Sequence, residues 1–303
     1  MTNRILVPLD GSALAEQAVP CAVALARALP AELVLFRAIG IPAEVLESLD
    51  ESHVERQAVG AQLKADAEGY LGALIERLRE AGLEASHALG CGSAADAILD
   101  YAEKEQIDQI VMATHGYGGL KRWTHGSVAE RVLQSARVPL LLIRVQDPER
   151  AEMEQRLMLC RRILVPLDGS ALAEHILPTV STLARALGAE LILFQVPISH
   201  VAGWMTGEWY LPVQGVLDTA EEDAQVYLEN VAEGLKEQGL QVTIATGVGP
   251  VASSIIEYAE ANQVDLIAMS THGRTGLARW ALGSVADRVL RSGSTPILLV
   301  RAE

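Results

Sequence analysis

The sequence predicts an α/β protein of two similar domains, each built on a parallel sheet covered by helices. Half of the 303 residues are hydrophobic but only 4% are aromatic, so the core must be mainly aliphatic. Strands buried on both faces of a parallel sheet have this composition. Apolar runs of strand length alternate with helical stretches, which indicates right-handed βαβ units. The length suits two domains of ordinary size.

An internal repeat defines the two copies. The thirteen residues Arg4–Glu16 recur unchanged at Arg162–Glu174, an offset of 158. Further along, the tripeptide at Thr114–Gly116 recurs at Thr271–Gly273, an offset of 157. One residue is therefore missing from the second copy, in a divergent stretch that we expect to be a loop.

The repeat also predicts the domain boundaries. We expect a first domain at residues 1–146, a linker at 147–159 and a second domain at 160–303. The linker segment has no counterpart within either copy, Pro148 stands near its start, and charged residues dominate its first part.

Each element of the first copy follows from its residues. The strands are short apolar runs, the first helix is rich in Ala and Leu, and a variable segment precedes a long helix. The expected elements are a strand at Ile5–Leu9, a helix at about Ser12–Leu29, a strand at Leu33–Ala38, a helix at about Arg56–Ala81, a strand near Leu83–Leu89, a helix from Ala94, a strand at Gln109–Ala113, a helix from Ser127 and a strand at Pro139–Val145.

Charge and cysteine content exclude several classes of protein. A formal net charge of −15 repels phosphate backbones, so we expect no general nucleic-acid binding, and an anionic ligand needs a local site. Three scattered cysteines, Cys21, Cys91 and Cys160, predict neither a disulfide framework nor a zinc site. No secretory signal or membrane-crossing apolar run is evident, so we expect a cytoplasmic protein with no membrane partner.

The first candidate ligand loop follows the first strand. It reads Pro8 to Ser12 and is repeated at Pro166 to Ser170. In open α/β sheets, ligands bind beyond the carboxyl ends of the strands, where the strand order reverses. The acidic residue, Asp10 or Asp168, can accept hydrogen bonds from ribose hydroxyls or from an adenine amino group. A tight turn with helix capping explains the same residues equally well.

The second candidate loop is rich in glycine and runs from Ser270 to Val285. Glycines let the backbone approach phosphate oxygens, and Gly283 with Ser284 precedes a helix whose amino end attracts anions. A capping box from Ser284 to Asp287, matched by Ser127 to Glu130, is the alternative. The loop is not a Walker A loop, because no Gly-Lys-Ser/Thr follows.

With these motifs, the chain resembles the universal stress protein family along nearly its whole length, twice. Nucleotide-binding members of that family carry G-x₂-G-x₉-G-[S/T]. The spacing is intact in both copies, but the first glycine is replaced by Ser270 in one and by Ala113 in the other. The resemblance implies Rossmann-like domains of the adenine nucleotide alpha hydrolase type. Each would have a five-stranded parallel sheet of order 3-2-1-4-5 with helices on both faces.

The resemblance also implies a ligand, ATP with Mg²⁺. The strand-one Asp would contact the adenosine portion, the residue ending strand two would offer backbone contacts to adenine, and the glycine loop would hold the phosphates. The candidate residues in the second copy are Pro166, Asp168, Val196, Met269, Ser270, His272, Gly273, Arg274, Gly283, Ser284 and Val285. Those in the first copy are Pro8, Asp10, Ala38, Met112, Ala113, His115, Gly116, Gly126, Ser127 and Val128.

The two copies differ in the charges of the glycine loop. Arg274 follows the loop glycine in the second copy, where the first copy has Tyr117, and a cation there helps to offset triphosphate charge. The first copy has Lys121, Arg122 and His125 in the same loop instead. We expect the second copy to be the better site.

Aromatic residues stand out because they are scarce. Trp204, Trp209 and Tyr210 lie in the variable segment of the second copy, as a lid, a partner-binding patch or a local cluster that holds a long loop. Trp123 and Trp280 occupy matching positions, which favours packing of the glycine loop.

No catalytic constellation and no metal-ligand spacing is evident, so we predict no dedicated enzyme. The leading hypothesis is an ATP-binding stress or signalling protein with at most slow hydrolysis. The alternatives are an interaction scaffold without nucleotide and an enzyme whose catalytic residues come from the variable segments. Family dimers pair through their last strands, so Val138–Val145 and Thr295–Arg301 are expected to meet within one chain. Two such chains can associate further.

Overall fold

The computed structural model of the chain describes residues 3–40, 53–115, 127–145, 160–197, 214–272 and 283–302. The chain divides into two compact units, Met1–Met158 and Leu159–Glu303, which we call the first and second domains. The expected linker at 147–159 lies outside the described residues. Each domain is described by itself below.

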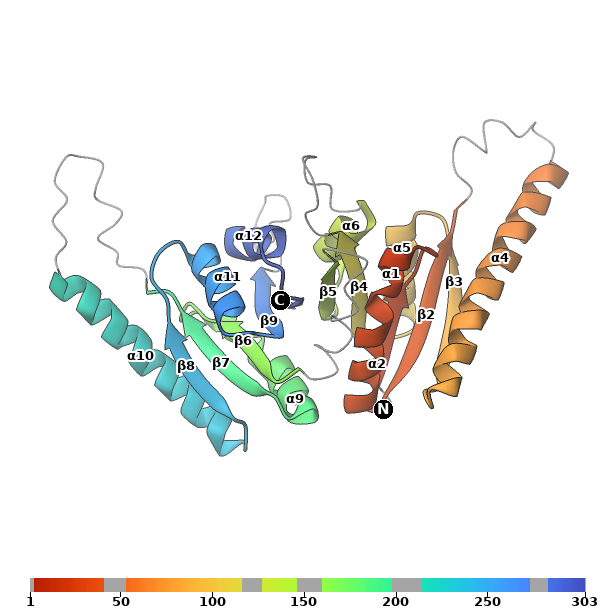
Figure 1. The fold of residues 1–303 in the computed structure, drawn as a ribbon. Helices are drawn as coiled ribbons and strands as arrows, with labels where there is room; N and C mark the ends of the chain where they lie inside the picture. The colour runs from red at the N-terminus through yellow and green to blue at the C-terminus, as the bar shows by residue number, and fades with distance from the viewer. Residues whose placement is uncertain are drawn as a thin grey trace, which may run out of the picture. The chain divides into compact units, whose positions relative to one another are not determined.

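Strands and helices alternate along the first domain, as expected (Figure 1). Its elements are β1 Asn3–Pro8, α1 Ala13–Glu16, α2 Ala18–Ala28, β2 Ala31–Ile39, α4 His53–Glu80, β3 Ala85–Cys91, α5 Ala94–Lys104, β4 Gln109–His115, α6 Ser127–Ser135 and β5 Leu140–Val145.

The second domain repeats this order. Its elements are β6 Arg162–Pro166, α8 Ala171–Glu174, α9 Leu177–Leu187, β7 Glu190–Gln195, α10 Gln214–Glu237, β8 Val242–Thr246, α11 Val251–Ala261, β9 Leu266–His272, α12 Ser284–Ser292 and β10 Ile297–Ala302.

The strand order confirms the predicted α/β fold. In the first domain the order is β3-β2-β1-β4-β5 and in the second β8-β7-β6-β9-β10, which is 3-2-1-4-5 in each. These neighbouring strands run parallel. Their interior residues are almost wholly aliphatic and buried, and the exposed fraction of Leu6, Val7 and Leu164 is 0%. The aliphatic core inferred from composition is therefore confirmed.

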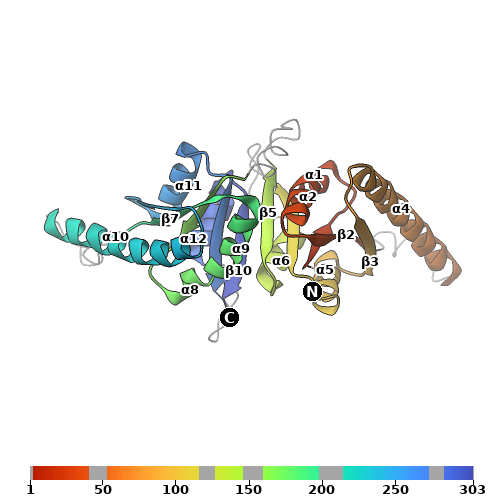
Figure 2. The ribbon, with the colours of Figure 1, turned by 90° about the horizontal axis from the view of Figure 1, so that it is seen from below.

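Helices cover both faces of each sheet (Figures 1 and 2). Consecutive strand residues point to opposite faces. The ring of Phe36 packs on Tyr101 of α5, with ring centroids 5.1 Å apart. The next residue, Arg37, lies over the ring of Tyr70 of α4, 5.3 Å from its centroid. Helices α4 and α5 therefore lie on opposite faces of the first sheet.

One expected helix is divided. A continuous helix over Ser12–Leu29 is wrong, because α1 ends at Glu16 and α2 begins at Ala18. Pro20 explains the break, since a proline ring clashes with the carbonyl four residues earlier, which is that of Glu16. In the second domain, Pro178 stands four residues after Glu174, the last residue of α8. A separate one-turn helix thus follows the first strand of each domain.

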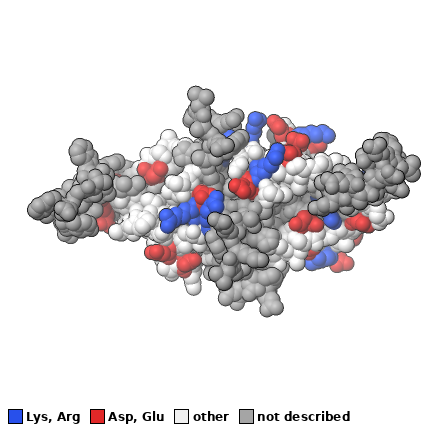
Figure 3. Space-filling model, turned by 90° about the horizontal axis from the view of Figure 1, so that it is seen from above, with Lys and Arg blue, Asp and Glu red and all other residues white. Residues whose placement is uncertain are grey.

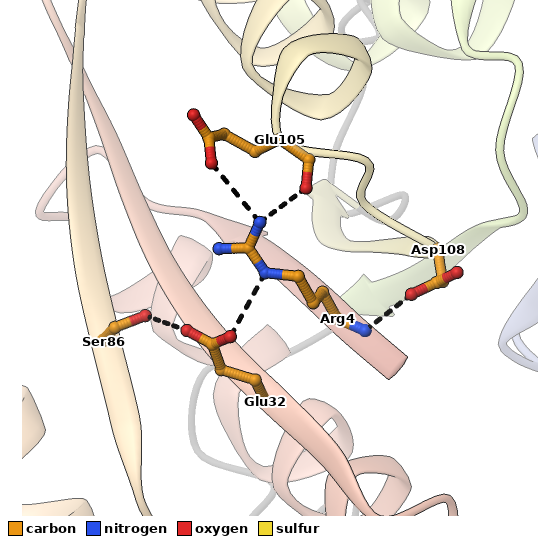
Figure 4. A network of polar contacts seen from close by, with 5 residues as sticks. All are labelled: Arg4, Glu32, Ser86, Glu105 and Asp108. Atoms are coloured by element: carbon orange, nitrogen blue, oxygen red, sulfur yellow. Dashed lines mark hydrogen bonds and ion pairs between the residues drawn. The ribbon is translucent and has the colours of Figure 1, made fainter. Parts of the chain in front are cut away.

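A polar network fixes the amino end of β1 (Figure 4). The guanidinium of Arg4 forms an ion pair with Glu32 of β2, with Nε and Oε2 3.2 Å apart, and donates to the carbonyl oxygen of Glu105. The hydroxyl of Ser86 in β3 donates to the other oxygen of Glu32 at 2.8 Å. The backbone N–H of Arg4 donates to the carboxylate of Asp108 at 2.7 Å. The network joins strands β1, β2 and β3 to the turn before β4.

The second domain contains the same network. Arg162 donates to the carbonyl of Asn262 at 2.7 Å, and its backbone N–H donates to Asp265 at 3.1 Å. Thr243 donates to Glu190 at 2.8 Å, as Ser86 does to Glu32. These contacts lie at the amino ends of the strands, away from the candidate ligand loops.

A glycine in each edge strand region makes room for a core phenylalanine. A Cβ on Gly247 would lie 2.5 Å from Cζ of Phe194, and a Cβ on Gly90 would lie 2.5 Å from Cζ of Phe36. Both distances are too short for carbon atoms. Phe194 is 1% exposed and packs on Tyr258, with ring centroids 4.8 Å apart, so it has no space to retreat.

Gly247→Ala is therefore expected to destabilise the second domain by about 1–3 kcal/mol, the usual cost of overpacking a core. Differential scanning calorimetry of the full chain measures the change. Gly234→Ala is the matched control, because a Cβ at this position on α10 meets nothing within 4 Å. It should stabilise by about 0.4–1 kcal/mol through the unfolded state. If the Gly247→Ala variant and the wild type have the same melting temperature, the ring of Phe194 can move to accommodate the added methyl group at no cost, which would contradict the prediction.

Candidate functional site

The two candidate loops follow neighbouring strands in each domain. In the second domain β6 lies between β7 and β9. The chain continues from β6 to β7 on one side and from β9 to β10 on the other, so the two connections run in opposite directions across the sheet. The ladder between β6 and β9 spans only Ile163–Leu266 and Leu164–Ile267, whereas β6 and β7 pair over five residues. The β1–β4 ladder is equally short. Pairing thus stops before the carboxyl ends at the point of reversal, where ligands bind in such sheets.

The aspartate loop is a capped turn. Oδ1 of Asp168 accepts from the backbone N–H of Ser170 at 3.0 Å and from its hydroxyl at 2.6 Å. The hydroxyl oxygen of Ser170 accepts from the N–H of Ala173 at 3.1 Å and so caps α8. The capping interpretation is confirmed for the serine. Both bonds to Asp168 use one oxygen and its side chain is exposed, so a ligand can still reach this carboxylate.

The same turn forms in the first domain. Oδ1 of Asp10 accepts from the N–H of Ser12 at 2.8 Å, and Ser12 caps α1 through Ala15 at 3.1 Å. Gly11 and Gly169 have φ values of +89° and +84°, a conformation that favours glycine. Identical sequences therefore give nearly identical turns.

The start of α12 has a glycine as its N-cap residue. Gly283 is its N-cap residue, with φ of +76°, and no side chain of the described residues caps the helix. The capping box expected from Ser284 to Asp287 is therefore wrong, because Ser284 is the first helical residue. Helix α6 likewise begins at Ser127 rather than after it. The backbone N–H groups of Ser284 and Val285, at the start of this helix, are suited to donating hydrogen bonds to an anion.

The first turn of α12 also contains an acidic residue that is neutralised. The Nε of Arg291 donates to both oxygens of Asp287 at 2.7 Å. In the first domain the matching pair is Glu130 and Gln134, an uncharged donor at 3.4 Å. A carboxylate near a helix amino end repels a phosphate, so its pairing with an arginine makes α12 the more favourable of the two for anions.

Ser270 links the two candidate loops of the second domain. Its hydroxyl donates to the carbonyl oxygen of Ala173 in α8 at 3.3 Å. Ala113 stands at the matching position in the first domain and has no hydroxyl, so this link is absent there. Ser270, which replaces the first motif glycine, thus joins β9 by a hydrogen bond to the helix that follows the aspartate loop.

Two tyrosines that were not predicted from the sequence contact the short helices that follow the aspartate loops. Tyr227 of α10 donates to Glu174 of α8 at 2.9 Å, and Tyr70 of α4 donates to Glu16 of α1 at 3.0 Å. Burial raises the pKa of both phenols, and the bonded carboxylates raise it further. Both hydroxyls therefore remain protonated donors. The repeat itself could have found them, because both pairs occupy matching positions in the two copies.

Several expected ligand residues are buried. Val196 is 8% exposed, Met269 7% and Met112 6%. Because the side chain of Val196 is buried, its backbone is the part that a ligand could contact. Ala38 and Pro166 are half-buried, Pro8 is buried, and Val128 and Val285 are half-buried at the helix starts.

Some expected residues lie outside the described part of the chain. They are Gly116, Tyr117, Lys121, Arg122, Trp123, His125, Gly126, Trp204, Trp209, Tyr210, Gly273, Arg274 and Trp280. His115 and His272 end their strands, and only their backbone is described.

Acidic and basic side chains are interspersed on the face seen from above in Figure 3. Among the described residues, no group of three His, Cys, Asp or Glu side chains could hold a metal ion. None of the described helices is both long and apolar enough to cross a membrane.

Comparisons with known proteins agree with the repeat. A model of the universal stress protein family matches residues 1–144 and again residues 160–301. One universal stress protein of Methanocaldococcus jannaschii is 32% identical over 145 residues, which cover 47% of this chain and 83% of the relative. One from Synechocystis is 24% identical over 317 aligned residues, which cover 99% of this chain and 100% of the relative.

A solved structure has the same architecture. The crystal structure of a universal stress protein from Archaeoglobus fulgidus matches with a TM-score of 0.73. The two proteins are 20% identical, and the match covers 99% of each chain. This likeness bears on the fold alone.

Ser270→Ala is expected to loosen α8. Loss of one hydrogen bond worth about 1 kcal/mol should speed amide exchange in residues 171–174 by about fivefold. Hydrogen exchange with mass spectrometry measures it. The reciprocal change, Ala113→Ser, is the matched variant and should protect α1 if the new hydroxyl reaches Ala15. Unchanged exchange in α8 of the Ser270→Ala protein would contradict the link.

Proposed function

The chain belongs to the universal stress protein family, and on that basis we propose that its second domain binds ATP in a stress-response or signalling role. The start of α12, which no side chain of the described residues caps, is the observation that carries the proposal, because Gly283 and Ser284 hold the phosphate positions of the family motif. N–H groups at a helix start favour the binding of phosphate, because they point at the ligand and the helix dipole attracts negative charge. Asp168 lies after the neighbouring strand, within the same reversal of strand order.

Each part of the nucleotide has a proposed partner. The carboxylate of Asp168 accepts hydrogen bonds from the ribose hydroxyls, and the backbone of Val196 contacts adenine. The N–H groups of Ser284 and Val285 bind the phosphates. Mg²⁺ would arrive with the triphosphate and have phosphate oxygens as its main ligands, as is usual for this ion.

The first domain is proposed as the weaker site. It has the same aspartate turn, but Ala113 provides no link to α1, and no arginine of the described residues pairs with Glu130 as Arg291 does with Asp287. The first difference leaves the aspartate turn less firmly positioned for a ligand. The second makes the start of α6 less attractive to an anion than the start of α12. We therefore propose one strong site in the chain rather than two.

We propose no dedicated enzyme activity and at most slow hydrolysis of ATP. The described part of the site contains Asp168 and Ser170, yet Ser170 is committed to Asp168 and to Ala173, so it is poorly suited to act as a nucleophile. The second candidate function is an interaction scaffold without nucleotide, which the intact motif spacing disfavours.

We also propose that β5 and β10, each the last strand of its own sheet, pair within one chain. An unpaired apolar edge invites another strand. Residues 160–303 expressed alone should therefore form dimers in sedimentation velocity. In the full chain β5 would already cover β10, so this edge should not cause dimerisation. A strictly monomeric second domain at high concentration would contradict this pairing.

Asp168→Asn is expected to weaken ATP binding by about 10- to 100-fold, because charged hydrogen bonds worth about 1.5–3 kcal/mol are lost. The asparagine oxygen can still accept from the N–H of Ser170, so the turn is kept. Isothermal titration of the full chain with ATP measures the affinity, and mass spectrometry after denaturation identifies any nucleotide that copurifies.

Asp10→Asn is the matched control, since its turn has the same sequence and should leave the strong site untouched. Wild-type protein that neither copurifies with nucleotide nor binds added ATP would refute the proposal and favour the scaffold. Steady turnover of ATP at about 1 s⁻¹ or faster would instead indicate an enzyme.

A further inference from the structure

A tyrosine on the long helix of the second domain supports the aspartate loop from behind. Tyr227 lies on α10 and donates to Glu174, the last residue of α8, at 2.9 Å. Burial raises the pKa of the phenol, the bond to Glu174 and the charges of Glu174 and Asp168 raise it further, and the nearby amide of Gly169 lowers it. The phenol therefore lies beside both ends of the segment Gly169–Glu174.

This segment is short and otherwise weakly held. It leaves β6 after Pro166, turns at Gly169 with φ of +84°, and forms a single helical turn that ends because of Pro178. One turn of helix has little stability of its own. Its position therefore depends on its packing against β9 and on side-chain hydrogen bonds, which among the described residues include Ser270 to Ala173 and Tyr227 to Glu174.

The first domain holds its loop with an additional group. Arg37 lies over the ring of Tyr70, and its guanidinium would be 3.5 Å from a Cβ on Gly11. Gln195 stands at the matching position, and a Cβ on Gly169 would meet nothing within 4 Å. Two residues thus lie behind the turn of the first domain, whereas Tyr227 alone among the described residues takes this place in the second.

We propose that Tyr227, through Glu174, is a positioning residue that holds the Asp168 turn in the shape that receives the adenosine portion of a nucleotide. This inference rests on the proposed function. Tyr227 lies behind the turn, on the α10 side, and we assign it no contact with the ligand. The phosphate positions at Gly283 and Ser284 are on a different element and should not depend on it.

The test is Tyr227→Phe in the full chain, with Tyr70→Phe as the matched control. ATP, ADP and AMP are titrated separately, and inorganic tripolyphosphate is titrated as a ligand without adenosine. We expect Tyr227→Phe to weaken all three nucleotides by the same factor, about five- to tenfold, and to leave tripolyphosphate binding unchanged. Tyr70→Phe should leave the strong site as in the wild type.

Two further variants separate the hydrogen bond from the charge. Glu174→Gln keeps an oxygen that accepts from the phenol, so it should bind nucleotides as the wild type does. Glu174→Ala should reproduce the loss seen with Tyr227→Phe. Wild-type affinity in both Tyr227→Phe and Glu174→Ala would overturn the inference, and so would an equal loss of tripolyphosphate binding, which would indicate general disruption. A wild-type protein that binds no nucleotide would instead refute the proposed function itself.

Discussion

Reciprocal hydrogen bonds between one aspartate and an arginine at the amino end of the central strand set the register on which each sheet depends. Asp108 accepts from the N–H of Arg4 and its own N–H donates back to the Arg4 carbonyl at 3.0 Å. Asp265 and Arg162 repeat the exchange. Slipping a strand by one residue would exchange the side chains that it directs to the two covered faces of the sheet. With the amino ends fixed, the central strands can separate at their carboxyl ends, where the candidate site lies.

Identical sequence does not make the two sites equivalent. The turns after β1 and β6 share thirteen residues and nearly the same geometry, yet their surroundings differ. Ser270 and Arg291 contribute a link and a neutralising charge in the second domain, while Arg37 covers the turn in the first. The differences come from elements distant in sequence, so a duplicated motif can acquire separate roles without any change in its own letters.

Much of the fold was predictable because it follows from local pattern. Apolar runs and the repeat predicted the strands, their parallel direction and the two domains, whereas the order of the strands came from the family resemblance. The break at Glu16 was missed, although Pro20 signalled it, because the Ala-rich stretch was treated as one helix. At the site, the aspartate turn was predictable from Asp-Gly-Ser. The bond of Ser270 was not predictable, because it joins residues 97 positions apart along the chain and depends on packing. The bond of Tyr227 was missed, although the same tyrosine–glutamate pair recurs at matching positions of the two copies.

The close approach of Gly247 to Phe194 constrains how this domain can change over evolutionary time. A larger residue at 247 is excluded while the phenylalanine remains, and a smaller residue at 194 leaves a cavity while the glycine remains. Neither single step is neutral, so the two positions are expected to change together or not at all. Gly90 and Phe36 face the same restriction. Each domain therefore contains one glycine–phenylalanine pair in which a change at either position requires a change at the other.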